Sequence, residues 1–142
     1  MKNLILLFAL SGTFMFAKSQ VIEVREVPTV VVSSFQTTYP SVTKVQWQRV
    51  GSNYEALYRD NQGDVYVTYD PSGKLIETGQ GIVTTSVPEP VTTYVKTKYK
   101  GDKLTKVYKV KDANGVVLYK GKVKDKYVFF DSNGNFIRED NK

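Results

Sequence analysis

Apolar residues recur at two different spacings along the chain, and each spacing predicts a different kind of element. At Val31, Phe35 and Tyr39 the interval is four residues, which places the three side chains on one face of a helix. From Val45 to Tyr69 apolar and polar residues alternate instead, as they do in half-buried strands. The pattern predicts one helix followed by a small antiparallel sheet.

Turn sequences divide the alternating region into three strands and a short fourth one at Leu75-Ile76. The turn formers are Gly51-Ser52-Asn53, Asn61-Gln62-Gly63 and Pro71-Ser72-Gly73. Because side chains alternate between the two faces of a strand, one apolar set shares a face that we expect to pack on the helix. This set is Trp47, Ala56, Tyr58, Val67 and Tyr69.

The same order of elements returns in the second half of the chain. Residues 27–39 match 87–99 at a spacing of 60, and residues 57–76 match 118–137 at a spacing of 61. Two matching blocks in the same order indicate a tandem repeat. We divide the chain into residues 1–19, a first repeat at 20–81 and a second at 82–142, with 77–87 as the linker. In the second repeat the helix-facing set is Tyr108, Val117, Tyr119, Val128 and Phe130.

The fold class predicted from these patterns is α+β, as a tandem repeat of one helix and an antiparallel sheet of three to four strands. Pro28 and Pro88 fit the first turn of each helix, where a missing amide hydrogen costs nothing. Pro40 and Gly101 close the two helices.

Residues 1–19 have the pattern of a signal peptide. Lys2 precedes an apolar run, and Ala17-Lys18-Ser19 provides small residues on both sides of a cleavage point. The alternative is an uncleaved membrane anchor, but the run is shorter than the ~20 residues that span a bilayer. The chain has no Cys, which excludes a lipid anchor on cysteine and excludes disulfides. We expect a periplasmic or secreted protein without a transmembrane segment after cleavage.

Charge is unevenly distributed between the two repeats. Residues 20–86 have a net charge of −2, whereas residues 87–142 have a net charge of +6, with Lys in almost every basic position. The basic half could attract a polyanion or the cell-envelope surface. The alternative is a solubilising face in which Lys protects strand edges from pairing.

The residue types argue against an enzyme and against a cofactor. Without His or Cys, imidazole bases, thiolate nucleophiles and the usual zinc sites are absent. Five aspartates near turns, read as turn formers rather than catalytic acids, are Asp60, Asp64, Asp70, Asp125 and Asp131.

Two of these turns resemble part of a calcium-binding loop, DNQGD at 60–64 and DSNGN at 131–135. Such a loop ends on a bidentate Glu, but Pro71 and Lys142 stand at the corresponding places, and the glycines come too early. We therefore interpret both as hairpin turns and expect no metal site. Nucleic acid is not an expected partner either, because the basic residues of the second repeat are Lys rather than Arg and the protein is exported.

The strand residues between the helix-facing positions point to the other side of the sheet. They combine aromatic, aliphatic and basic side chains, which is typical of protein interfaces. The alternatives are that residues 20–26 cover this face or that the aromatics only reflect strand propensity. The predicted partner-binding residues are Leu57, Arg59, Tyr66, Thr68, Leu118, Lys120, Tyr127 and Phe129.

The complete pattern resembles the β-lactamase-inhibitor-like, PepSY-like family of secreted and periplasmic bacterial proteins. The residues that carry the resemblance are Val27-Pro28, Phe35, Tyr39-Pro40, Val45, Trp47, Tyr54, Ala56, Tyr58, Tyr69-Asp70 and Gly73. The second repeat departs from it, with Lys100 where Pro is expected, Tyr108 for Trp47 and Gly115 for Tyr54.

This resemblance implies the fold of a β-lactamase inhibitor protein, with a helix packed on an antiparallel sheet in each repeat. It also implies a binding role for the free face of the sheet. The predicted function is an exported, non-enzymatic binding module, an inhibitor or partner of an envelope or secreted protein. The alternative is a polyanion or cell-envelope surface binder that uses the Lys-rich second repeat.

Overall fold

The computed structural model describes residues 19–141, which form one antiparallel sheet of nine strands and two α-helices. The signal-peptide prediction lies outside the described residues except for Ser19. The helices are α1 (Thr29–Thr38) and α2 (Glu89–Lys98), preceded by the 3-10 helices η1 (Val24–Glu26) and η2 (Thr84–Ser86). The strands are β1 (Ser19–Ile22), β2 (Gln46–Val50), β3 (Asn53–Arg59), β4 (Asp64–Tyr69), β5 (Leu75–Ile82), β6 (Leu104–Asp112), β7 (Val117–Val123), β8 (Lys126–Asp131) and β9 (Phe136–Asn141).

The strands follow one another across the sheet in chain order, so the two repeats share a single sheet. This is possible because β5 pairs with β4 on one side and with β6 on the other. The predicted linker at 77–87 is therefore wrong, since residues 77–82 belong to β5 and only the remainder connects to α2. This half of β5 is polar or glycine (ETGQG) before Ile82, so it lacks the apolar alternation that marks a strand.

Segment 19–22 also forms a strand that the sequence pattern did not predict. As β1 it pairs with β2, from Ser19 opposite Val50 to Ile22 opposite Trp47. It extends the sheet at one edge, so the alternative that residues 20–26 cover the free face is wrong for this segment.

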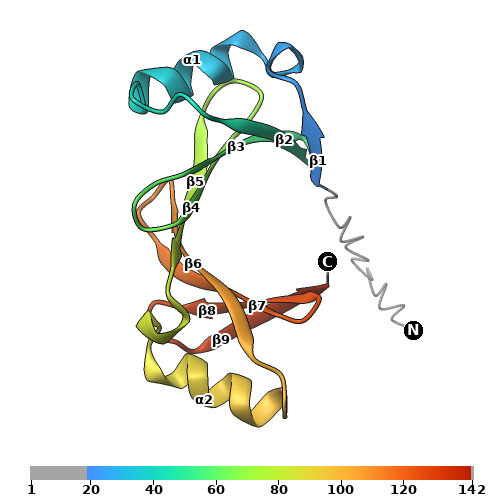
Figure 1. Cartoon of the computed structure of the whole chain (residues 1–142), viewed down its shortest axis with the longest axis vertical. Coiled ribbons are helices and arrows are strands. Elements are labelled where there is room, and N and C mark those ends of the chain that lie inside the picture. The colour runs from blue at the N-terminus through green and yellow to red at the C-terminus, as the bar shows by residue number, and fades with distance from the viewer. Residues whose placement is uncertain (1–18, 142) are drawn as a thin grey trace, which may run out of the picture.

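The sheet is strongly curved, and the two helices lie outside its two ends (Figure 1). α1 connects β1 to β2, and α2 connects β5 to β6. Both helices pack on the convex side of the sheet, and within residues 19–141 no helix lies over its concave side (Figure 1).

Each helix begins and ends as its sequence indicates. Pro28 directly precedes the first helical residue of α1, and its carbonyl accepts a hydrogen bond from the Val31 amide at 2.9 Å. At the other end the Tyr39 amide donates to the Phe35 carbonyl at 2.8 Å. Val31 and Phe35 are buried and Tyr39 is half-buried, so the predicted apolar stripe is confirmed.

The two repeats have cores of different composition. Beneath α1 the Phe35 ring packs edge-on against Trp47 at 5.6 Å between centroids and against Tyr58 at 6.0 Å. Ala56, Val67 and Tyr69 complete this core, as the alternation predicts. Beneath α2 the core is mainly valine, with one large ring: Val91, Val95, Val123, Val128 and Phe130.

The hairpins of the second repeat differ in length from those of the first. Two residues separate the paired Val50 and Asn53, whereas seven separate the paired Val110 and Leu118. The β6–β7 connection is therefore five residues longer than the β2–β3 connection. The spacing between matching residues of the two repeats hardly reflects this difference, because the next connection is shorter.

That next connection joins β7 to β8. Six residues separate the paired Tyr58 and Val65, and only two separate the paired Val123 and Lys126. The loss of four residues nearly cancels the gain of five, so the sequence spacing changes only from 60 to 61. The structural counterpart of Tyr58 is thus Val123, although Tyr119 matches it in sequence.

The changed hairpin corrects one predicted face. Trp47 pairs with Ala56, and the pair in the same place of the second repeat is Val107 with Gly121. Val107 is fully buried and replaces Trp47, whereas Tyr108 lies on the concave side. The prediction that Tyr108 faces the helix is wrong because an offset of one residue reverses the face of a strand residue.

Three of the hairpin turns have the same geometry, centred on Asp70, Asp112 and Asp131. In each, the Asp carboxylate accepts hydrogen bonds from the backbone amides two and four residues later, at 2.9–3.0 Å. The glycine that follows has φ between +83° and +89°, which favours glycine. Asp70 and Asp131 are therefore turn formers, as predicted.

Candidate binding face

The concave face is the side of the sheet that carries Leu57, Tyr66, Tyr108, Lys120 and Phe129. The register brings these residues together: Leu57 lies opposite Tyr66, and Lys120 lies opposite both Tyr108 and Phe129. All eight predicted partner-binding residues lie on this face, because Arg59, Thr68, Leu118 and Tyr127 follow in the same alternation.

These residues differ greatly in exposure. Tyr66, Thr68 and Phe129 are only 5%, 6% and 9% exposed, whereas Arg59 is exposed. Leu57, Leu118, Lys120 and Tyr127 are half-buried. The expectation of an exposed Tyr66 is wrong, because neighbouring side chains close over its ring within the curved sheet.

One glycine at the centre of the sheet explains how Tyr66 becomes buried. Gly79 lies opposite Tyr66 in β5, and a Cβ atom on Gly79 would collide with the Tyr66 ring. Without that atom, Tyr66 lies over β5 and meets Tyr108 of β6 at 5.3 Å between ring centroids, edge to face. The two repeats are thereby joined on the concave face by an aromatic pair that spans a whole strand.

Lys120 holds the centre of the concave face. Its ammonium nitrogen lies 4.6 Å from the centroid of the Tyr127 ring, 5.4 Å from Tyr66 and 5.8 Å from Phe129. Among the ion pairs within residues 19–141, none involves Lys120. Aromatic faces thus stabilise this cation through their quadrupoles, without a carboxylate in direct contact.

Two residues of this face were missed by the sequence pattern. Tyr108 was assigned to the opposite side, and Arg138 was not considered a site residue. The Arg138 guanidinium lies 4.0 Å from the Phe129 ring centroid and donates to Asp140 at 3.3 Å. The alternation in β9 relative to β8 was the signal that could have placed Arg138 here, since it lies opposite Phe129.

The first-repeat side of the concave face holds a hydrogen-bonded acidic network. Glu55 accepts hydrogen bonds from the Gln48 amide at 2.6 Å and from the Thr68 hydroxyl at 3.1 Å. The Tyr66 hydroxyl donates to Glu77 at 3.1 Å. Burial raises the pKa of Glu55 above its ordinary value, and burial likewise raises the pKa of the Tyr66 hydroxyl.

The carboxylates near turns have the opposite electrostatic character. Hydrogen bonds from neighbouring backbone amides hold the pKa of Asp60 low, and those of Asp70 and Asp131 are lowered by side-chain and backbone donors of their own turns. A general acid needs a pKa raised towards neutrality. These groups therefore act as turn acceptors, and no group of three or more possible metal-ligating side chains occurs within residues 19–141.

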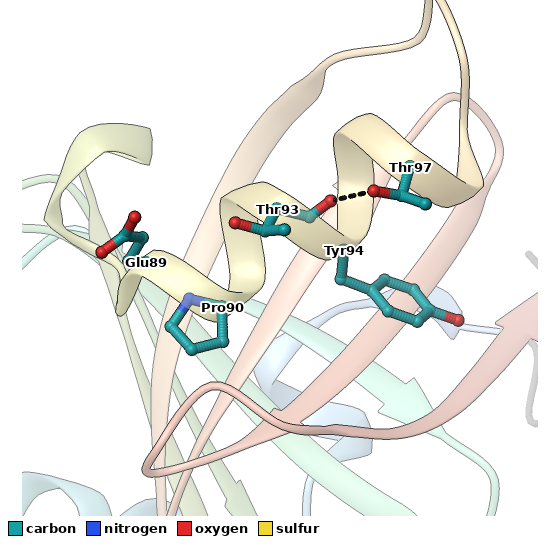
Figure 2. A pocket seen from close by; sticks show the side chains of 5 residues that line it. All are labelled: Glu89, Pro90, Thr93, Tyr94 and Thr97. Carbon is teal, nitrogen blue, oxygen red and sulfur yellow. Dashed lines mark hydrogen bonds between the residues drawn. The ribbon is translucent and has the colours of Figure 1, made fainter.

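The surface of α2 bears a separate shallow hollow of about 500 Å³ (Figure 2). Its lining comes from one helix: Glu89, Pro90, Thr93, Tyr94 and Thr97. Tyr94 points away from the helix axis, and its ring stacks on Phe136 at 4.7 Å between centroids. One face of the Tyr94 ring is thus already covered by the protein's own strand β9.

Comparison with known proteins agrees with the architecture. The family described as "Putative beta-lactamase-inhibitor-like, PepSY-like" matches twice, at residues 6–77 and 77–138. The chain belongs to this family. The resemblance seen in the sequence is therefore confirmed, with two copies of the family unit. A search of curated proteins found no match.

Solved structures of Bacteroides proteins share the fold. A DUF2874 family protein from Bacteroides ovatus has a TM-score of 0.68 at 21% identity, covering 81% of this chain and 87% of its own. A putative periplasmic protein from Bacteroides eggerthii gives 0.70 at 17%, with 81% and 88% covered. A BLIP-like protein from Bacteroides fragilis gives 0.61 at 18%, with 81% and 86% covered. The α+β fold with helices on one side of an antiparallel sheet is therefore that of the BLIP-like proteins.

Within residues 19–141, neither helix has the length and apolar character needed to cross a membrane.

Proposed function

We propose that this protein is an exported, non-enzymatic binding module that holds a partner protein against its concave face. The observation that carries the proposal is the cluster around Lys120, in which one cation and three aromatic rings gather on a face that neither α1 nor α2 covers. Tyrosine is among the residue types enriched at the positions that dominate binding energy in protein interfaces, and Tyr127 is the half-buried ring of this cluster that a partner can reach.

The family and the fold support a binding role rather than catalysis. The family is described as inhibitor-like, and one protein of the same fold is described as BLIP-like. The protein of similar fold from Bacteroides eggerthii is described as a putative periplasmic protein. We infer an inhibitor or assembly partner of an envelope or secreted protein, acting in the periplasm or outside the cell.

The test begins with capture of the partner from the protein's own cell envelope and medium, followed by binding measurements with the purified partner. Lys120→Ala and Tyr127→Ala should each weaken binding at least about tenfold, as expected for central interface residues. Both side chains are half-buried, so circular dichroism and thermal unfolding must first show that each variant folds.

The matched control is Lys109→Ala. Lys109 is an exposed lysine that lies opposite Tyr119 on the convex side of the sheet. The Lys109→Ala variant removes the same charge as Lys120→Ala and should leave the affinity for the partner unchanged. Equal affinity for wild type, Lys120→Ala and Tyr127→Ala would overturn the proposal.

The alternative, a polyanion or cell-envelope surface binder, stays a prediction. The lysines of the second repeat are not gathered on one side of the sheet. Lys109 and Lys111 lie on the convex side of β6, whereas Lys120 and Lys122 lie on the concave side of β7. Lysines spread over both sides give a weaker local field than the same charges on one side. Binding that weakens steeply with salt, equally in Lys109→Ala and Lys120→Ala, would favour this alternative.

A further inference from the structure

Next to the aromatic pair of Tyr66 and Tyr108, the concave face is hollowed into a pocket of about 530 Å³, here called the junction pocket. Leu57, Tyr66 and Tyr108 provide apolar and aromatic lining. The pocket needs both repeats, because Leu57 and Tyr66 come from β3 and β4, whereas Tyr108 comes from β6.

Glycines in the intervening strand bring these two sides together. Gly81 lies opposite Tyr108, and a Cβ atom on Gly81 would approach the Asp64 backbone oxygen to 2.9 Å. Gly79 lets the Tyr66 ring lie over the same strand. The close approach of the two repeats at the pocket therefore depends on backbone positions that tolerate no side chain.

The lining of the junction pocket is positively charged. It includes Lys44, Arg59 and Lys106 but only one carboxylate, Asp64, which gives a net charge of +2. The two oxygens of Asp64 accept from different cations: Lys106 at 2.8 Å and Arg59 at 3.2 Å. One carboxylate thus holds two cations in place and neutralises only one of the charges.

The cations keep donors for a further anion. The Arg59 side chain is 78% exposed, and it contacts Asp64 through a single nitrogen, Nη1. The Lys106 ammonium, 46% exposed by side chain, also lies 5.2 Å from the Tyr108 ring centroid. Asp64 and Tyr108 fix this ammonium from two sides, so an incoming anion meets a cation that is already ordered.

We propose that the junction pocket receives an acidic side chain, Asp or Glu, from the protein that binds the concave face. This inference rests on the proposed function, because the pocket lies on the same face and shares Tyr66 with the Lys120 cluster. Charge complementarity favours the carboxylate, and the apolar walls of Leu57 and Tyr66 suit the methylene groups that carry it.

The experiment uses two small probes of the same shape, acetyl-Gly-Glu-Gly-amide and acetyl-Gly-Gln-Gly-amide. Each is titrated into the isotope-labelled protein, and backbone amide shifts are followed by NMR. The Glu probe should shift the amides around Asp64, Lys106 and Tyr108 in a saturable way, and the neutral Gln probe should not. Equal shifts from both probes, or shifts elsewhere, would overturn the proposal.

Two variants sharpen this result. Lys106→Gln should weaken binding of the Glu probe at least about threefold, as expected for loss of one partly exposed ion pair. Lys109→Gln removes a lysine from the same strand but on the convex side, outside the pocket lining, and should leave the affinity unchanged. Equal effects of the two variants would show only a diffuse field and contradict a specific site.

A third probe, acetyl-Gly-phosphoseryl-Gly-amide, separates carboxylate from phosphate. Binding of this probe alone would refute the carboxylate assignment. The proposed function and this inference also fail separately. If Lys120→Ala abolishes partner binding but the Glu probe causes no shifts at the pocket, the proposed binding face is supported and the proposed acidic side chain in the junction pocket is refuted. If the Glu probe binds but neither Lys120→Ala nor Tyr127→Ala changes the affinity for the partner, the proposed function is refuted.

Discussion

Tyr66 and Tyr127 stand at the same place in the two repeats, yet they have different surroundings. Tyr66 is 5% exposed, whereas Tyr127 is half-buried. The residue directly opposite Tyr66 is Gly79, and the residue opposite Tyr127 is Asp140. A duplicated strand thus keeps its register, while one residue in the neighbouring strand decides whether the same side chain becomes core or surface.

The largest expected difference between the two tyrosines is in stability. Tyr66→Ala removes a buried ring and its packing on Tyr108, and should lower the free energy of unfolding by about 3 kcal/mol or more. Tyr127→Ala removes a half-buried ring and should cost about 1 kcal/mol or less. Urea unfolding of both variants measures the difference. Equal losses would mean that the two repeats use this position in the same way.

The difference between Tyr66 and Tyr127 can also be tested at the residues opposite them, Gly79 and Asp140. Gly79→Ala places a methyl group where the Tyr66 ring lies and should destabilise the protein by about 1–3 kcal/mol through overpacking. Its counterpart Asp140→Ala should change the free energy of unfolding by about 0.5 kcal/mol at most, because Asp140 makes only an exposed ion pair with Arg138. Urea unfolding is again the measurement. A neutral Gly79→Ala would show that the Tyr66 ring can move aside without loss.

The features that the sequence predicts correctly are local. The helix stripe of Val31 and Phe35 depends on residues one turn apart, and the Asp70 turn closes within five residues. Both are determined by neighbours in the chain, so they can be predicted without knowledge of the rest of the fold. The alternation of β2, β3 and β4 likewise placed Trp47, Ala56 and Tyr69 in the core.

The features that were missed depend on distant strands. Thr78 and Gln80 form strand β5 because β4 and β6 flank them, not because their own sequence favours a strand. Tyr108 was placed on the wrong face because one longer and one shorter hairpin nearly cancel in the sequence spacing. The burial of Tyr66 follows from Gly79, a residue that no periodicity in β4 could reveal.

Where the two repeats are alike, matched mutations should behave alike. Asp70 and Asp131 accept the same backbone hydrogen bonds at the ends of β4 and β8. Asp70→Ala and Asp131→Ala should therefore lower the urea midpoint by similar, small amounts, because each leaves the same turn amides to water. A large loss in only one variant would indicate that the turn has a further role in that repeat.

The smallest expected effect is the pH dependence of stability from two glutamates, Glu55 in the first repeat and Glu139 in the second, whose pKa values shift in opposite directions. Burial raises the pKa of Glu55, so the unfolded chain releases this proton first as pH rises from the ordinary value near 4.5. The wild type should therefore lose stability relative to Glu55→Gln between that pH and the higher pKa of the folded state. Hydrogen bonds from Tyr99 and Lys126 lower the pKa of Glu139 instead.

For Glu139 the sign is reversed. Its contribution is fully present above a pH near 4.5 and is lost as pH falls through the lower pKa of the folded state. The stability of wild type relative to Glu139→Gln should therefore rise with pH, whereas that relative to Glu55→Gln should fall. Urea unfolding from pH 3 to pH 7, about the range in which carboxyl groups titrate, measures both slopes. Parallel slopes would show that burial at Glu55 is relieved by its hydrogen bonds from Gln48 and Thr68, and that the two halves do not differ in this respect.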